Sequence, residues 1–145
     1  MLVVVDTNVF VGACLGQGPS AAAVVAACLQ GSCQPLMGAA LLAEYEDVLG
    51  RAALFSRSRL GADERSELLD IFLADCRWTR IYFGWRPNLR DEGDNHLVEL
   101  AVAGGAECIC THNLRDLKSH ELTFPGLGLR TPAQLLKLIK AKEPP

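Results

Sequence analysis

Short apolar runs alternate along the chain with longer segments that carry apolar residues at helical spacing. The strand-like runs lie at residues 2–5, 34–37, 78–83 and 107–111, and residues 128–130 can form a short edge strand. The first run is continuously apolar and β-branched, which is typical of a central parallel strand buried on both faces. The alternation predicts an α/β fold, a three-layer α/β/α sandwich around a mostly parallel central sheet.

The helical segments have recognisable starts and ends. Ser20 and Asp63 are candidate N-caps, and Thr131 offers a capping hydroxyl before a proline at the first helical position. Asp94 opens a further helix, which Gly104 and the next glycine close. We expect helices at about residues 8–15, 20–31, 39–54, 63–76, 94–105 and 131–142. No repeat or linker divides the sequence, so we expect one domain over residues 1–145.

Composition narrows the class of protein. Half of the 145 residues are hydrophobic, which excludes a disordered chain, and the formal net charge of −3 excludes a simple basic nucleic-acid-binding tail. No apolar run reaches the roughly 18 residues that span a bilayer. The sequence starts with a strand-like run and an acid rather than a signal segment. We therefore expect a cytoplasmic protein that does not contact a membrane.

The six cysteines do not form a recognisable disulfide or zinc pattern. Three disulfides would suit a small secreted domain, but the expected compartment keeps thiols reduced. No CxxC pair occurs, and the histidines do not fall at zinc-finger spacing. Cys108 and Cys110 share one face of a predicted strand. We therefore interpret the cysteines as small buried hydrophobic residues.

Four acidic residues fall where an α/β sheet binds ligands. Asp6 ends the first strand, Glu44 lies within a helix, Asp94 opens the helix before the fourth strand, and Asp116 follows that strand. Ligands bind beyond the carboxyl ends of parallel strands, so these carboxylates can converge on one edge. Clustered carboxylates repel one another, and Mg²⁺ or Mn²⁺ resolves the repulsion by binding to oxygen ligands. The spacing therefore predicts a site for a hard divalent cation.

Two other α/β classes with acidic sites fit less well. A response-regulator receiver domain needs an early acidic pair and a lysine after a later strand, whereas Asp6 stands alone and no lysine precedes Lys118. A haloacid-dehalogenase phosphatase needs an aspartate two residues after the first and a threonine four residues after it. This chain has Asn8 and Phe10 at those positions.

Five segments, in chain order, match the motifs of one family. They are Val-Val-Val-Asp6-Thr7-Asn8-Val, residues 41–49 around Glu44, residues 91–101 around Asp94, residues 111–117 with Asn113 and Asp116, and the helix start Thr131-Pro-Ala-Gln-Leu135. Together they resemble the PIN-domain proteins, and the resemblance covers essentially the whole chain. Each motif is weak alone, because an acid after an apolar strand is common. The four acidic motifs together, at compatible spacing, are strong evidence for this resemblance.

The resemblance implies a PIN-like fold and a metal-dependent ribonuclease. Single-domain bacterial and archaeal members are often VapC-type toxins that an antitoxin holds inactive. Carried onto this sequence, Asp6, Glu44 and Asp94 match the catalytic metal ligands. Some members carry the fourth acid where this chain has Asn113 and others where it has Asp116. We favour Asp116 as the carboxylate, which leaves open whether a second metal binds.

Further residues are candidates for supporting roles. Around the acids we expect contributions from Thr7, Asn8, Asp91, Thr111 and Asn113. Candidate RNA contacts are Arg57, Arg59, His96 and Arg115. Each has a plainer interpretation as well: the aspartates that precede helices can be simple N-caps, and charged residues more often lie on a solvated face.

The first hypothesis is therefore an endoribonuclease that uses Mg²⁺ or Mn²⁺, hydrolyses RNA phosphodiester bonds and serves as the toxin of a toxin–antitoxin pair. The alternative is a non-catalytic PIN-like module that binds RNA or protein. Expected partners are RNA, a cognate antitoxin and a second copy of the chain in a homodimer. Four of the 17 acidic residues would belong to the site itself, so the acidic balance does not exclude an RNA substrate.

Overall fold

The computed structural model describes residues 1–81, 95–114 and 127–142. Its centre is a five-stranded sheet in the order β3-β2-β1-β4-β5, in which every neighbouring pair is parallel. The strands are β1 (Leu2–Val5), β2 (Gln34–Met37), β3 (Arg77–Trp78), β4 (Cys108–Cys110) and β5 (Gly128–Arg130). The strand order reverses direction between β1 and β4, which makes this pair the topological switch point of the sheet.

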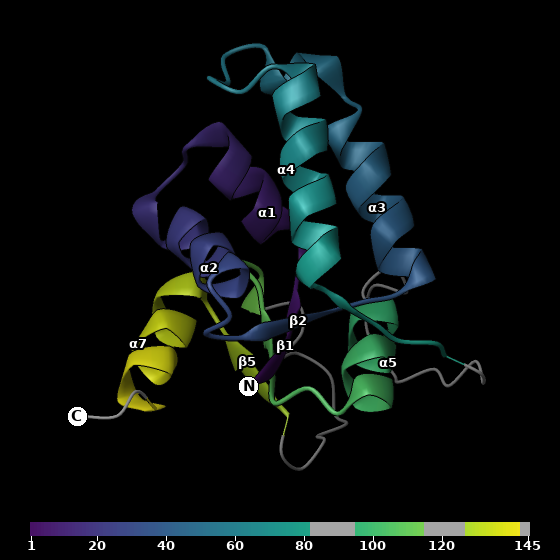
Figure 1. The fold of residues 1–145 in the computed structure, drawn as a ribbon, viewed down its shortest axis with the longest axis vertical. Coiled ribbons are helices and arrows are strands. Elements are labelled where there is room, and N and C mark those ends of the chain that lie inside the picture. Colours follow the sequence, from purple (N-terminus) through teal and green to yellow (C-terminus); the bar gives the residue numbers. More distant parts are fainter. Residues whose placement is uncertain (82–94, 115–126, 143–145) are drawn as a thin grey trace.

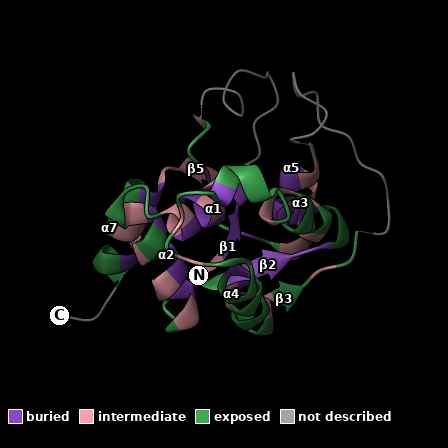
Figure 2. Cartoon of the chain, turned by 90° about the horizontal axis from the view of Figure 1, so that it is seen from above, coloured by how far each residue is buried: buried purple, intermediate pink, exposed green. Residues whose placement is uncertain are grey.

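Helices cover both faces of the sheet and confirm the predicted three-layer sandwich. They are α1 (Thr7–Leu15), α2 (Pro19–Leu29), α3 (Ala39–Leu49), the 3₁₀ turn η1 (Ala52–Phe55), α4 (Ala62–Asp75), α5 (Asn95–Gly104) and α7 (Pro132–Lys142). α5 packs against β1, β2 and β4, whereas α2 and α7 lie together on the other side (Figure 2). α3 and α4 rise side by side above the sheet (Figure 1).

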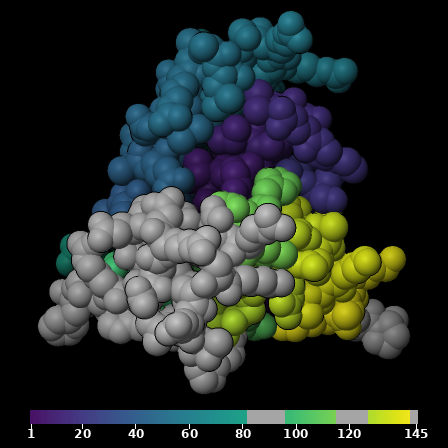
Figure 3. Space-filling model, turned by 180° about the vertical axis from the view of Figure 1, so that it is seen from behind, coloured from purple at the N-terminus to yellow at the C-terminus, as the bar shows by residue number. Residues whose placement is uncertain are grey.

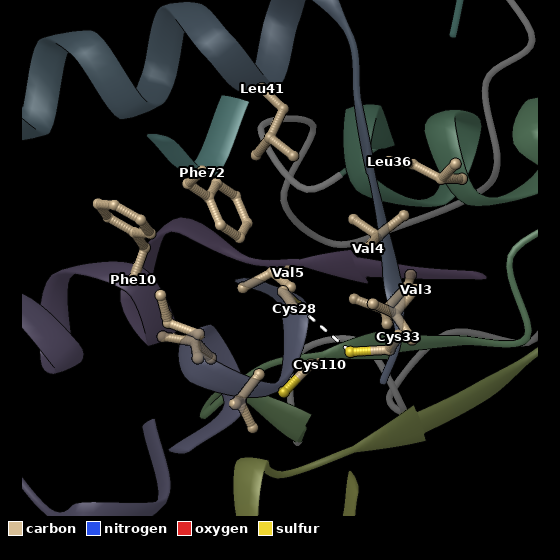
Figure 4. Packing of buried hydrophobic residues seen from close by; sticks show 14 of the residues in the cluster. Val3, Val4, Val5, Phe10, Cys28, Cys33, Leu36, Leu41, Phe72 and Cys110 are labelled. Carbon is tan, nitrogen blue, oxygen red and sulfur yellow. Dashed lines mark hydrogen bonds between the residues drawn. The ribbon is translucent and has the colours of Figure 1, made fainter. Parts of the chain in front are cut away.

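The core is built around β1, because this strand has neighbours on both edges and helices on both faces. Val3, Val4 and Val5 are almost fully buried, and each contributes about 1.5–3 kcal/mol of hydrophobic stabilisation. All six cysteines are free, and all but Cys76 are buried, which confirms their interpretation as small apolar residues. Cys28 and Cys33 lie in contact, with 3.3 Å between their sulfur atoms (Figure 4).

Three aromatic side chains join α1, α3 and α4 beyond the end of β1. The ring centroids of Phe10 and Tyr45 lie 5.2 Å apart, and those of Phe10 and Phe72 lie 5.1 Å apart. The Tyr45 hydroxyl donates a 2.7 Å hydrogen bond to the carbonyl oxygen of Val5. This bond ties α3 to the last residue of β1 and so fixes the helix that carries Glu44.

Two helix boundaries follow the sequence signals closely. Gly16 ends α1 in the left-handed conformation, with φ of 70°, which glycine adopts without strain. At the start of α7 the Thr131 hydroxyl accepts from the backbone N–H of Gln134, and the Gln134 side chain accepts from the N–H of Thr131. This reciprocal pair is a capping box, so the predicted cap at Thr131 is confirmed.

Two predicted caps are wrong. α2 begins at Pro19 with Gly18 at the N-cap, so Ser20 lies inside the first turn. The reason is that proline is well suited to the first helical position. α4 begins at Ala62, and the Glu64 carboxylate accepts from the backbone N–H of Gly61 at the N-cap. Asp63 therefore lies in the first turn, where it interacts favourably with the helix dipole.

Two predicted lengths are also wrong. The helix expected at 39–54 ends at Leu49, because Gly50 and the extended backbone of Arg51 interrupt it before η1. The strand expected at 78–83 covers only Arg77–Trp78. Its partner β2 ends at Met37, so residues 80 and 81 have no β2 residue beside them to pair with. Residues 82 and 83 lie outside the described residues.

Among the helices that the structure describes, none by itself is long and apolar enough to cross a membrane. α1 and α2 reach that length and composition only as a pair, which is bent by 109°.

We predict that Tyr45→Phe destabilises the protein while keeping the aromatic packing. The substitution removes only the hydroxyl, so the Val5 carbonyl loses its donor in a buried environment. The free energy of unfolding should fall by about 1–3 kcal/mol. Urea unfolding followed by circular dichroism measures it.

The matched control is Asp47→Asn on the same helix. Asp47 forms an exposed 2.7 Å ion pair with Arg51, and its loss should change the free energy of unfolding by no more than about 0.5 kcal/mol. A Tyr45→Phe effect no larger than that of the control would contradict a structural role for the hydroxyl.

Candidate active site

Asp6 lies at the centre of the candidate site. It follows the last residue of β1 at the switch point, and its backbone N–H donates to the carbonyl of Cys110 on β4. Only 7% of Asp6 is exposed. It occupies the N-cap position of α1, yet its side chain makes no capping hydrogen bond. The plainer interpretation of Asp6 as an N-cap therefore does not explain where its carboxylate points.

The Asp6 carboxylate is held from the neighbouring strand instead. The Thr111 hydroxyl, fully buried just after β4, donates a 2.7 Å hydrogen bond to Asp6 Oδ2. The same hydroxyl oxygen accepts from the backbone N–H of Asn113 at 2.9 Å and from Asn8 Nδ2 at 3.4 Å. Because both of these partners donate to Thr111 Oγ1, the single hydroxyl proton remains for Asp6.

Asn8 connects the first turn of α1 to the segment after β4. Its side-chain Nδ2 donates to Asp6 Oδ2 at 3.3 Å, and its Oδ1 accepts from the backbone N–H of His112 at 3.2 Å. The segment after β4 lies against the N-terminal helices in the view from behind (Figure 3). The predicted supporting residues Asn8, Thr111 and Asn113 are thus brought together around Asp6.

Glu44 reaches the site from α3 and is paired with His96 of α5. Glu44 Oε2 and His96 Nε2 lie 2.7 Å apart. The Glu44 side chain is 38% exposed and that of His96 is 18% exposed, so the pair lies at the edge of the core. Both side chains are close enough to Asp6 to affect its ionisation. Three elements distant in sequence thus contribute to one site.

The surroundings of Asp6 and Glu44 shift the pKa values of these two carboxyl groups in opposite directions. Burial raises the pKa of Asp6 above its ordinary value, and repulsion from Glu44 adds to that shift, while the hydrogen bond from Thr111 opposes it. The hydrogen bond from His96 lowers the pKa of Glu44 below its ordinary value. The charged form of Asp6 is therefore less well compensated by its surroundings than the charged form of Glu44.

The donor atoms suit a hard cation. The Thr7 hydroxyl oxygen is buried and has no hydrogen-bond partner among residues 1–81, 95–114 and 127–142, although it lies near enough to Glu44 to lower the pKa of that carboxyl. Carboxylate and hydroxyl oxygens are typical ligands of Mg²⁺ and Mn²⁺. In the described part of the chain, however, no three His, Cys, Asp or Glu side chains are grouped as a metal-binding cluster.

Four of the predicted site residues lie outside the part of the chain that the structure describes. They are the acids Asp91, Asp94 and Asp116 and the candidate RNA contact Arg115, so their roles stay predictions.

Arg57 and Arg59 are exposed in the connection between η1 and α4. Ser58, between them, donates to the carbonyl of Cys14 near the far end of α1. α1 begins beside Asp6 and has nine residues, a length of about 13 Å, so these arginines lie beside the opposite end of that helix. Their contact with RNA also stays a prediction.

Two features were not found from the sequence. His96 was expected to contact RNA, but its Nε2 is paired with Glu44. Tyr45 was not singled out by the sequence analysis, but its hydroxyl anchors α3 to β1. Neither pairing leaves a local signal, because each depends on how two separate elements pack.

A buried aspartate at the switch point, with a second carboxylate beside it, defines an α/β domain with an acidic site. The sequence matches the family model described as PIN domain over residues 2–115. The chain therefore belongs to the PIN-domain family, whose members are generally nucleases.

The fold is also that of a known structure. A crystal structure of VapBC2 from Rickettsia felis, bound to a DNA fragment from their promoter, contains a chain that is 20% identical and superposes with a TM-score of 0.57. The match covers 90% of this chain and 98% of the other. A search of curated protein sequences found no match.

We predict opposite effects on stability for the two carboxylates in the metal-free protein. Asp6→Asn should raise the melting temperature by a few degrees at neutral pH, because asparagine can accept the same hydrogen bonds without a buried charge. The folded pKa of Asp6 is raised, so its ionised form costs stability above that pKa. This cost shrinks as the pH falls through the raised folded pKa and is gone below the unfolded pKa. The advantage of Asp6→Asn should therefore shrink on acidification.

Glu44→Gln should instead lower the melting temperature slightly at neutral pH. The folded pKa of Glu44 is lowered, so its ionised form contributes stability above the unfolded pKa, and this contribution is lost as the pH falls through the folded pKa. The effect is small because the side chain is partly exposed. Thermal denaturation in EDTA from about pH 4 to 7 measures both variants, and shifts of the same sign would contradict the assignment.

Proposed function

We propose that this protein is a divalent-metal-dependent endoribonuclease. The observation that carries the proposal is the Asp6 carboxylate, which is buried, repelled by Glu44 and located at the switch point of a PIN-domain sheet. A carboxylate in this environment gains most from a bound cation. RNA as the substrate is supported by the resemblance of the four acidic motifs to those of PIN-domain ribonucleases.

In this proposal Asp6 and Glu44 supply carboxylate oxygens to Mg²⁺ or Mn²⁺, and the matching motifs add Asp94 and Asp116. When bound, such an ion supplies the positive charge that favours attack of water on a phosphodiester and offsets charge on the phosphate. The Thr111 hydroxyl and the Asn8 amide fix the position of Asp6 Oδ2.

The described site is also suited to ligand binding before a ligand is present. The Thr7 hydroxyl, which has no hydrogen-bond partner within the ranges that the structure describes, is available to a ligand atom beside Glu44. Because Thr111 and His96 hold Asp6 and Glu44 by 2.7 Å hydrogen bonds, little reorganisation of these two carboxylates is needed when substrate binds. No side-chain nucleophile is required.

We further propose that the protein is the toxin of a toxin–antitoxin pair in the cytoplasm and forms a homodimer. The supporting observation is the likeness in fold and in length to a chain of the VapBC2 complex. A neighbouring reading frame that encodes a small protein with a DNA-binding N-terminus would support the pair. Light scattering that finds only monomer would count against the homodimer.

The second candidate is a PIN-like module that binds RNA or protein without cleaving it. Asn113 favours it, because this neutral residue occupies a position where some family members carry an acid. Such a module would keep the fold and the hydrogen bonds around Asp6 but would not bind a catalytic metal.

We predict that Asp6→Asn abolishes metal-dependent RNA cleavage without unfolding the protein. The variant keeps the acceptor for the Thr111 hydroxyl but removes a carboxylate from the cation. Cleavage of unstructured RNA with Mg²⁺ or Mn²⁺ should fall by about two orders of magnitude or more. Asp47→Asn, on the exposed face of α3, should cleave like the wild type. Undiminished cleavage by Asp6→Asn would remove Asp6 from the mechanism.

We also predict that the wild-type protein binds Mn²⁺ in a calorimetric titration and that Asp6→Asn does not. The buried carboxylate supplies much of the electrostatic gain on binding. Wild-type protein that shows no heat of binding at millimolar Mn²⁺ would favour the non-catalytic module.

A further inference from the structure

The pair between His96 and Glu44 joins two helices across the edge of the site. His96 lies in the first turn of α5 and Glu44 in the middle of α3. The 2.7 Å distance between Nε2 and Oε2 is that of a strong hydrogen bond. A carboxylate can only accept, so His96 Nε2 carries the hydrogen that lies between them.

The other ring nitrogen of His96 has no hydrogen-bond partner in the described part of the chain. His96 Nδ1 is buried and makes no hydrogen bond to the residues that the structure describes. With Nε2 paired to Glu44 and Nδ1 buried, neither nitrogen is presented to a phosphate. This geometry disagrees with the expectation that His96 binds RNA directly.

Glu44 needs such a partner to stay in the site. Its side chain is partly exposed and has three rotatable bonds, so ordering it costs conformational entropy. Repulsion from Asp6 also favours conformations that point away from the site. The Nε2–H of His96 opposes both effects, because it holds one Glu44 oxygen at a fixed place and leaves the other to bind a ligand.

We propose that His96 is a positioning residue that orients Glu44 for cation binding and does not contact the substrate. The inference rests on the proposed function, since it concerns how a metal ligand of that site is held. Partners that orient metal ligands typically contribute roughly 10–100-fold to metal affinity.

The test is calorimetric titration of Mn²⁺ into the metal-free full chain and three variants. His96→Ala removes the donor and should weaken Mn²⁺ binding roughly 10–100-fold. His96→Gln can place an N–H near the position of Nε2 and should restore much of the affinity. Val102→Ala, at an exposed position on the same helix, should bind Mn²⁺ like the wild type.

Kinetics with RNA separate positioning from substrate contact. At saturating Mn²⁺ the KM for RNA of His96→Ala should stay near the wild-type value, because the ring does not bind phosphate. A KM raised tenfold with unchanged Mn²⁺ affinity would assign His96 to the substrate and overturn the inference.

A second readout needs no metal. Nitrogen-15 NMR of the metal-free protein should show a hydrogen bound to His96 Nε2, the atom that faces Glu44. A ring whose Nε2 carries no hydrogen would overturn the inference, because it could not donate to Glu44.

The outcomes also distinguish this inference from the proposed function. Wild-type protein that binds Mn²⁺ and cleaves no RNA contradicts the nuclease but supports the role of His96 if His96→Ala weakens binding. Wild-type protein that cleaves RNA, with His96→Ala binding Mn²⁺ equally well, overturns the role of His96 alone. Absence of Mn²⁺ binding by the wild type overturns both.

Discussion

The site is organised by the burial of one carboxylate at the end of an apolar strand. β1 must be apolar to occupy the centre of the sheet, and the residue that follows it, Asp6, is carried into the same low-dielectric region. A buried charge is costly unless neighbouring groups compensate it. Two hydrogen-bond donors do so in part: the Thr111 hydroxyl and the Asn8 amide. Glu44 acts in the opposite direction, so the compensation is incomplete.

The incomplete compensation of the Asp6 charge explains the role of contacts that lie around the two carboxylates. Thr111 can donate to Asp6 because two N–H groups already occupy its acceptor positions. Glu44 stays near a charge that repels it because His96 binds one of its oxygens and Tyr45, on the next position of α3, ties the helix to Val5. The packing of Tyr45 against Phe10 therefore serves both the core and the geometry of the site. Tyr45 therefore contributes both to the stability of the core and to the position of Glu44 in the site.

The sequence predicts well those features that depend on local chemistry. The β-branched run before Asp6 is sufficient to place a buried strand, and Thr131 before a proline is sufficient to place a helix start. The convergence of Asp6 and Thr111 follows from the rule that parallel strands end at one edge. The length of β3 could not be predicted, because it depends on where β2 ends rather than on its own residues. The partner of His96 depends on the rotation of α5 against α3, which no spacing along one helix encodes.

The identity of residue 6 separates the two candidate functions on physical grounds. An asparagine at this position would accept the hydrogen bonds from Thr111 and Asn8 and would avoid both desolvation of a charge and repulsion from Glu44. A module that only binds a partner through its outer surface would lose stability because of the buried carboxylate and would gain no function from it. A cation bound by Asp6 and Glu44 would offset the repulsion between them, so the buried charge would contribute to cation binding. The carboxylate at residue 6 therefore favours the metal-dependent nuclease over the non-catalytic module, and it does so independently of the acids that lie outside the described residues.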